Sequence, residues 1–143
     1  MIVAIAFAWS GAVVAISFLE TPLKFRAPGI TLKLGLGIGR IVFRAMNVLE
    51  GVLAAGLVIA AILGLADGST SGPSEVSVAG AVAVLTLLAQ VALVRPALAR
   101  RTAAVLADRA EGGSRVHLAY VALELVKLAS LIVAGVAALV ALA

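Results

Sequence analysis

Four long runs of apolar residues constrain the fold of this chain more than any other feature. They cover residues 2–19, 45–66, 76–94 and 116–142. The shortest has eighteen residues, and an apolar helix of about that length crosses the roughly 30 Å hydrocarbon core of a bilayer. A secretory signal peptide is the rival interpretation of the first run, but no basic residue precedes it, so we expect a retained span.

Composition separates this chain from the soluble and the disordered classes. Of its 143 residues, 64% are hydrophobic and 13% are charged, and its mean hydropathy is +1.23. A soluble domain carries about 45–50% apolar and about 25% charged residues, and disordered chains lack apolar residues. The sequence therefore predicts an all-α fold, a four-helix bundle that forms a single transmembrane domain over residues 1–143.

The same composition opposes several kinds of site. The chain has no cysteine, one histidine and two methionines, which argues against a metal centre. Four Phe, one Trp and one Tyr are too few for a surface that stacks nucleic-acid bases. We therefore expect no metal, no cofactor and no nucleic-acid partner.

The basic residues are concentrated in two of the three connections. Residues 20–44 and 95–115 hold five bases each, whereas the turn at 67–75 is rich in Gly, Pro and Ser and has two acids and no base. Because Lys and Arg mark cytoplasmic loops, both termini are predicted to face outward from a bacterial inner membrane. Eight bases are expected to face anionic lipid headgroups: Lys24, Arg26, Lys33, Arg40, Arg44, Arg95, Arg100 and Arg101.

The two basic connections carry weaker patterns of their own. Over residues 32–39, Leu and Ile alternate with Lys33 and three glycines, which does not match a dinucleotide-binding motif. We interpret this segment as a flexible interfacial connector rather than a re-entrant or anion-binding loop. In the other connection, Pro96 is expected to open a helical stretch that either extends the third span or lies at the interface. Gly112-Gly113 would end that stretch, and Ser114 would cap the next helix.

An internal repeat is indicated at an offset of 74 residues. This shift places Pro22 on Pro96, Arg26 on Arg100 and Glu50 on Glu124. The chain would then consist of two similar helical hairpins, at about 1–68 and 75–143, related by an axis along the membrane normal.

Three charged residues lie inside the predicted spans. Glu50, Glu124 and Lys127 would each cost about 2.5–3.5 kcal/mol at the bilayer centre, so such residues seldom face lipid. Glu124 and Lys127 share one helical stripe with His117 and Tyr120, and the repeat brings Glu50 to a similar depth. The predicted polar core comprises Glu50, Glu124, Lys127, Asn47, Gln90, Tyr120 and His117.

Two further residues have less specific interpretations. His117 is expected to be an interfacial, hydrogen-bonded histidine rather than a metal ligand. Trp9 lies in the middle of the first run and is interpreted as a packing residue.

One stretch carries a family resemblance. The run from Arg95 to Val105, followed by His117, Tyr120, Glu124 and Lys127, resembles an uncharacterised family of small four-span bacterial membrane proteins. This family is similar to the eukaryotic transmembrane proteins linked to cisplatin resistance, and more distantly to copper-resistance membrane domains. The resemblance covers about a third of the chain and implies a four-helix fold but little chemistry.

Two functions compete for the polar core. The first is a small transporter or channel that moves a proton, an ion or a small polar solute, working as a homodimer. The alternative is an accessory or assembly subunit that packs against a larger membrane complex, with the polar contacts serving only to hold helices together. No catalytic motif is present, so we do not expect an enzyme, although activity on a lipid or a quinone ranks third.

Overall fold

The computed structural model describes residues 1–66, 68, 74–107, 109 and 115–142. Four continuous helical stretches in these ranges are long and apolar enough to cross a membrane: Ile2–Lys24, Leu32–Ala66, Glu75–Leu106 and Arg115–Val140. The prediction of an all-α chain with four helical stretches able to cross a membrane is confirmed for the described residues. The predicted turn at 67–75 and the caps at Gly112-Gly113 and Ser114 fall mainly or wholly outside these residues.

Two of the stretches are composite. The first joins α1 (Ile2–Val13), the π-helical segment η1 (Val14–Glu20) and α2 (Thr21–Lys24). The third joins α4 (Glu75–Ala89), the π-helical segment η2 (Gln90–Val94) and α5 (Arg95–Leu106). The second and fourth are the single helices α3 (Leu32–Ala66) and α6 (Arg115–Val140).

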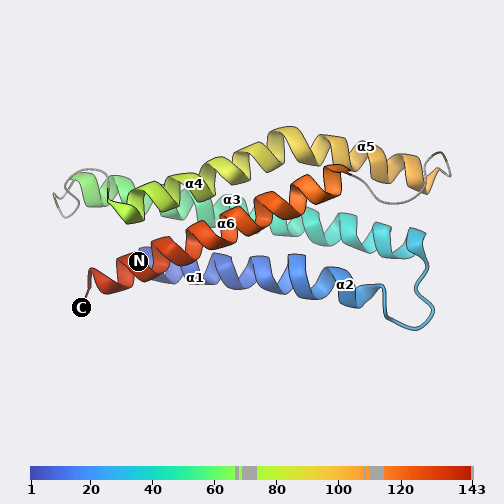
Figure 1. Cartoon of the computed structure of the whole chain (residues 1–143), viewed down its shortest axis with the longest axis horizontal. Helices are drawn as coiled ribbons and strands as arrows, with labels where there is room; N and C mark the ends of the chain where they lie inside the picture. The colour runs from blue at the N-terminus through green and yellow to red at the C-terminus, as the bar shows by residue number, and fades with distance from the viewer. Residues whose placement is uncertain (67, 69–73, 108, 110–114, 143) are drawn as a thin grey trace.

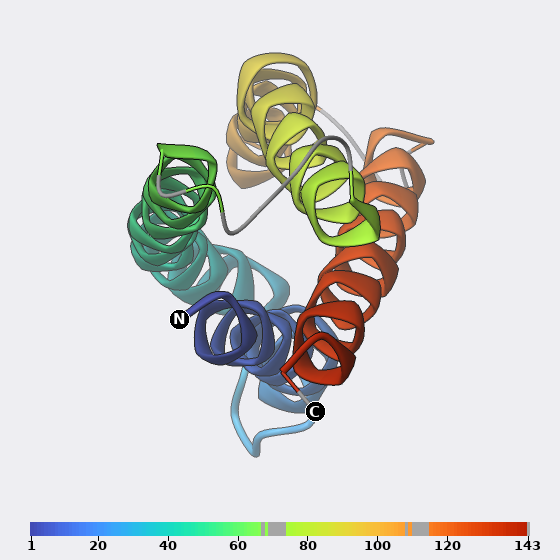
Figure 2. The same cartoon turned by 90° about the vertical axis from the view of Figure 1, so that its left-hand side faces the viewer.

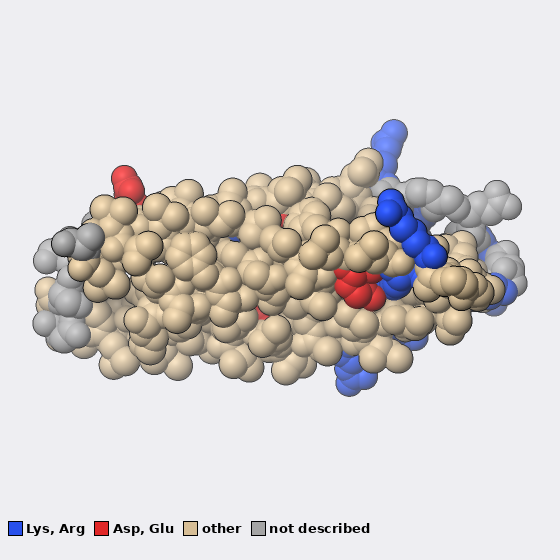
Figure 3. Space-filling model, turned by 90° about the horizontal axis from the view of Figure 1, so that it is seen from below, with Lys and Arg blue, Asp and Glu red and all other residues tan. Residues whose placement is uncertain are grey.

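The four stretches surround a common axis in the order α1, α3, α4, α6 when seen from one end (Figure 2). The start of α1 and the end of α6 lie at the same end of the bundle, which we call the terminal end (Figure 1). The opposite end, where α2 and α5 end and where α3 and α6 begin, is the basic end. On the face seen in Figure 3, Lys and Arg lie toward the basic end, and most of the remaining surface is uncharged.

The interpretation of residues 32–39 as a flexible connector is wrong, because α3 begins at Leu32. Two local features start the helix there. Ala27 accepts a hydrogen bond from Ile30 N–H at 3.2 Å, and Gly29 between them has φ of 77°, as in a type II turn with Pro28 at its second position. Thr31 then caps the helix, since its Oγ1 accepts from Leu34 N–H at 3.2 Å.

The glycines of this segment serve close packing between α2 and α3. A Cβ at Gly35 would lie 2.3 Å from the Phe25 ring, and one at Gly39 would lie 2.9 Å from Lys24 Nζ. Gly37, which lies between them, has nothing within 4 Å of such a Cβ. Gly35 and Gly39 therefore form the surface of α3 on which α2 rests.

The helical stretch at Pro96 extends the third span, which continues through α5 to Leu106. The π-helical segments mark the same point in both composite spans. Thr21 N–H donates to Ile16 O and Arg95 N–H donates to Gln90 O, both five residues back, and a proline follows each donor. Because proline lacks an N–H and its ring clashes with the carbonyl four residues earlier, the backbone widens before it.

The helices pack unevenly around the axis. α6 has its most extensive contacts with α4 and α1, whereas α3 makes fewer contacts with its neighbours. In the half of the bundle nearer the terminal end, the buried side chains are mainly apolar, and these include Ala6, Leu57, Ala83, Leu131 and Ala134. Two buried hydroxyls on α1 and α4, Ser10 and Thr86, donate to carbonyls of their own helices. The terminal half is therefore an apolar core.

Candidate functional site

Glu50 of α3 lies at the centre of a buried network and is fully buried. Its Oε1 accepts from Trp9 Nε1 at 3.0 Å and from Lys127 Nζ. Its Oε2 accepts from Arg95 Nη2 at 3.0 Å. Three of the four spans thus each send one donor to the carboxylate that the remaining span, α3, carries.

Lys127 of α6 joins the two carboxylates and is also fully buried. Besides Glu50, its ammonium donates to Gln90 Oε1 at 2.8 Å. It lies 2.9 Å from Glu124 Oε2, which is an ion pair by distance but lacks hydrogen-bond geometry. We call Trp9, Glu50, Gln90, Arg95, Glu124 and Lys127 the charged core.

The charged core is balanced. It contains two carboxylates, an ammonium and a guanidinium, so its charges sum to zero when all four groups are ionised. Burying an unpaired charge is far more costly than burying a paired and hydrogen-bonded one. The stability of the bundle around the charged core therefore depends on all four charged groups being present together.

Several polar atoms around the charged core have no hydrogen-bond partner among the described residues. They are Asn47 Oδ1, Gln90 Nε2, Arg95 Nη1, Tyr120 Oη and Glu124 Oε2, of which the last is ion-paired with Lys127. A buried donor or acceptor without a partner costs about 1–3 kcal/mol. Ordered water, an ion or a solute satisfies groups of this kind in proteins.

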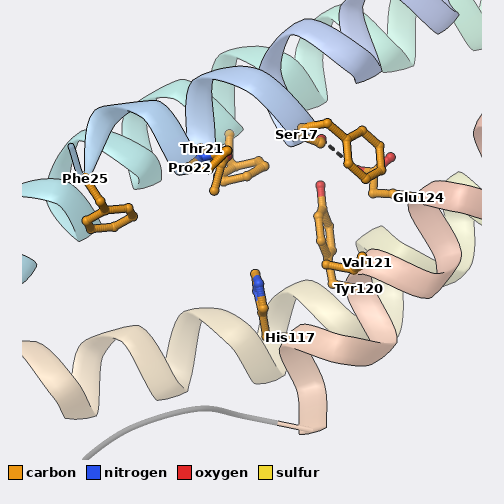
Figure 4. Close-up of a pocket in the computed structure, with 10 residues that line it drawn as sticks. Ser17, Thr21, Pro22, Phe25, His117, Tyr120, Val121 and Glu124 are labelled. Atoms are coloured by element: carbon orange, nitrogen blue, oxygen red, sulfur yellow. Dashed lines mark hydrogen bonds between the residues drawn. The ribbon is translucent and has the colours of Figure 1, made fainter. Parts of the chain in front are cut away.

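A pocket of about 420 Å³ opens beside the charged core toward the basic end. It lies between the η1–α2 part of the first span and the first turns of α6 (Figure 4). Glu124 forms part of its wall, and Ser17 Oγ donates to Glu124 Oε1 at 3.4 Å. The lining residues are Ser17, Phe18, Thr21, Pro22, Phe25, Phe43, His117, Tyr120, Val121 and Glu124.

The structure brings together four of the seven predicted polar-core residues in direct contact: Glu50, Gln90, Glu124 and Lys127. Tyr120 is buried in the wall of the pocket, 4% exposed. Asn47 is half-buried, and His117 is exposed at the rim of the pocket.

Two bases assigned to lipid headgroups lie elsewhere. The prediction that Arg95 faces lipid headgroups is wrong, because its side chain is 14% exposed and is paired with Glu50. The same prediction for Lys24 is wrong, because its side chain is 9% exposed and pairs with Glu20 at 3.1 Å. The Lys24 ammonium lies 5.6 Å from the ring centres of both Phe25 and Phe43, so aromatic rings and a carboxylate replace the headgroup.

Sequence reasoning also missed the part played by Trp9, which is more than a packing residue because it donates to Glu50. A Trp far from either interface was the available signal, since a buried indole N–H needs an acceptor. Arg95 could not be found in this way. Gln90 and Arg95 are five residues apart, which places them on different faces of an α-helix, but the five-residue hydrogen bond of η2 alters that relationship.

Within the described residues, no group of three or more His, Cys, Asp or Glu side chains is placed to hold a metal ion. Comparison of the chain with protein-family models, with curated proteins and with solved structures found no significant match. The resemblance to four-span bacterial membrane proteins therefore stays a prediction.

Proposed function

We propose that this protein is a small membrane transporter that moves a proton, or a small polar solute with it, through the charged core. The observation that carries the proposal is the position of Glu124. Its carboxylate is both part of the pocket wall and ion-paired to Lys127. A solute in the pocket would thus contact the same network that extends to Glu50 in the middle of the bundle.

The proton is the solute that this network suits best. Lys127 lies within hydrogen-bonding or ion-pair distance of both Glu50 and Glu124, so protons could pass between carboxylates over short distances. Ionisable groups inside membrane spans commonly mark such relays. The pocket would supply the entrance from the basic end.

The apolar core of the terminal half supports a two-state mechanism. The side chains that fill it, such as Leu57, Ala83 and Leu131, offer no polar path beyond the charged core. Transport would therefore require the helices to separate at the terminal end, in a second conformation that closes the pocket.

The test is proton flux into proteoliposomes that contain a trapped pH-sensitive dye. We expect protein-dependent flux, and at least a tenfold loss in the double variant Glu50→Gln/Glu124→Gln. Glu75→Gln is the matched control, because Glu75 is an exposed acid at the start of α4. Absence of flux in the unmodified protein, or equal flux in the folded double variant, would rule the proposal out.

We further propose that the basic end faces the cytoplasm of a bacterium, because Lys and Arg mark cytoplasmic segments. The chain has no cysteine, so single cysteines at Thr31 and Ser77 can report the orientation. A membrane-impermeant maleimide should label Ser77→Cys in intact spheroplasts and leave Thr31→Cys unlabelled. The reverse pattern would contradict the orientation.

We also propose that the two hairpins are a duplication. Support comes from the π-helical segments, since the donors Thr21 and Arg95 and the prolines that follow them are each separated by 74 positions, as are Glu50 and Glu124. An experimental structure in which superposing residues 2–66 on 76–140 needs a rotation far from 180° would contradict it.

A second function, an assembly subunit in a larger membrane complex, is favoured by a different observation. Both buried carboxylates are paired and the terminal half is apolar, as expected for a core that only holds helices together. Purification in mild detergent distinguishes the two functions. A stoichiometric partner supports the subunit, whereas a homogeneous homodimer supports the transporter.

A further inference from the structure

We infer that the pocket beside Glu124 binds a neutral aromatic alcohol, such as a phenol or a quinol. The hydroxyl of this ligand would donate to Glu124 and accept from Tyr120. This inference concerns binding and goes beyond the transport proposal. It would hold for a transported solute, a regulator or a bound lipid-soluble molecule alike.

The lining of the pocket requires a ligand with a flat apolar body. Phe18, Phe25 and Phe43 contribute three rings, and Pro22 and Val121 contribute aliphatic surface. Aromatic rings pack on one another in offset or edge-to-face arrangements. Phe43 and Tyr120 already form an edge-to-face pair with ring centres 5.8 Å apart, which holds the Tyr120 ring in place.

The polar groups at the inner end of the pocket require a ligand group that both donates and accepts. Tyr120 Oη is buried and points toward the side of the pocket where Glu124 lies (Figure 4), but its approach to that carboxylate falls short of hydrogen-bond geometry and it has no other partner among the described residues. The carboxylate of Glu124 can only accept, and its Oε2 also lacks a hydrogen bond. A hydroxyl satisfies both groups at once, since it donates one hydrogen bond and accepts another.

The charges around the pocket favour a neutral ligand. Lys127 already pairs with Glu124, so the carboxylate does not need a cationic ligand. The Lys24 ammonium lies 5.6 Å from the centres of the Phe25 and Phe43 rings, where it would repel a second cation. An anion would be repelled by the Glu124 carboxylate. A lipid acyl chain would fit the rings but would leave Tyr120 Oη without a hydrogen bond.

The location suits a molecule that comes from the membrane. Tyr120 lies five residues after the start of α6 at Arg115, or roughly 7 Å along the helix. Pro22, Phe25 and His117 at the mouth are exposed. Molecules with a ring and a hydroxyl concentrate near this depth of a bilayer, because one end is apolar and the other is polar.

The experiment is calorimetric titration of the full chain in nanodiscs with para-hexylphenol, after subtraction of the signal from empty nanodiscs. Two probes of similar size serve as comparisons. Para-hexylanisole cannot donate to Glu124, and para-hexyl-trimethylanilinium carries a positive charge. We expect saturable binding of the phenol at one site, and binding of the other two that is at least tenfold weaker.

Variants link the binding to the pocket. Tyr120→Phe removes the free hydroxyl and should weaken phenol binding about tenfold, the effect of one hydrogen bond. Val121→Trp fills the pocket and should abolish binding. Ser130→Ala is the control, because Ser130 lies on the same helix and donates to Val126 O, outside the pocket.

Several outcomes would overturn the inference. Equal binding of the anisole would show a slot that recognises only apolar surface. Equal or tighter binding of the anilinium would show a cation site. Absence of saturable phenol binding, or binding that Tyr120→Phe and Val121→Trp leave unchanged, would show that no such site exists here. Because no flux is measured, none of these outcomes depends on whether the protein transports protons.

Discussion

Glu50 is the residue on which the charged core depends most. It takes hydrogen bonds from Trp9, Arg95 and Lys127, and it supplies half of the negative charge that balances the two cations. Removing one member of a buried charge network is costly because the remaining charges stay buried without compensation. The consequence is that changes to the network should compensate one another when they restore charge balance.

We predict that Glu50→Gln lowers the free energy of unfolding by about 3–5 kcal/mol, because it leaves Arg95 and Lys127 with one carboxylate. Reversible unfolding in mixed micelles measures the change. The double variant Glu50→Gln/Arg95→Gln should recover part of the loss, since it restores neutrality. Glu75→Gln, at an exposed position, should change stability by no more than about 0.5 kcal/mol. A double variant that is less stable than Glu50→Gln alone would show that charge balance is not the controlling factor.

The residues of the charged core differ in how well their sequence positions predicted them. Glu50, Glu124, Lys127 and Gln90 were predicted because polar groups in apolar runs are conspicuous and must find one another. Arg95 was missed because it stands at the edge of its run, where an Arg ordinarily reaches lipid headgroups. Its contact with Glu50 depends on where the third span is placed relative to α3, and no local pattern encodes that placement.

At the scale of single helices, the glycines of α3 have two effects: they lower its helix propensity, and they allow α2 to pack closely against it. The alternation of glycines with Leu and Ile over residues 34–39 resembles a flexible segment, since glycine disfavours helix by about 1 kcal/mol relative to alanine. The helix forms nonetheless, because Pro28-Gly29 makes a turn, Thr31 caps the first turn, and α2 packs on the glycine face. The prediction of a connector overlooked Pro28-Gly29 and Thr31, which are ordinary turn and cap residues, and the packing of α2 is a tertiary contact that no local pattern encodes.

Glycine-to-alanine substitutions in α3 should therefore have opposite effects at neighbouring positions. Gly37→Ala should stabilise the protein by about 0.5–1 kcal/mol, because alanine favours the helix and nothing lies within 4 Å of the new Cβ. Gly35→Ala should be less stable than Gly37→Ala by about 1–2 kcal/mol, because the Phe25 ring must leave a position 2.3 Å from the new Cβ. Unfolding of both variants under the same conditions gives the comparison. Equal stability would mean that α2 does not rest on this face.

The molecule as a whole is divided into a polar half at the basic end and an apolar half at the terminal end. The contact between α1 and α6 closes the apolar half. A Cβ at Gly135 would lie 3.4 Å from the Ala6 Cβ, near the lower limit of about 3.5 Å for Cβ atoms joined by a disulfide. Since the chain has no cysteine, a pair introduced at these positions would be the only thiols present.

We predict that oxidation of Ala6→Cys/Gly135→Cys forms a disulfide that holds the terminal end closed. If transport requires that end to open, oxidation should reduce proton flux at least tenfold, and reduction should restore it. The pocket is remote from this contact, so binding of para-hexylphenol should be unchanged. Ala6→Cys/Gly51→Cys is the mismatched control, because nothing lies within 4 Å of a Cβ at Gly51. Undiminished flux in the cross-linked protein would contradict opening between α1 and α6.

The order of the charged core along the chain has a consequence for biosynthesis. The cationic partners of Glu50 come 45 and 77 residues after it, so the first hairpin leaves the ribosome before either of them emerges. During that interval the carboxyl has only Trp9 as a partner, and a carboxylate without a cationic partner enters lipid at a high cost. Insertion of this hairpin is therefore expected to be a slow, reversible step that the second hairpin completes. A glycosylation reporter on a chain truncated after residue 68 should show partial insertion, and Glu50→Leu should make it complete.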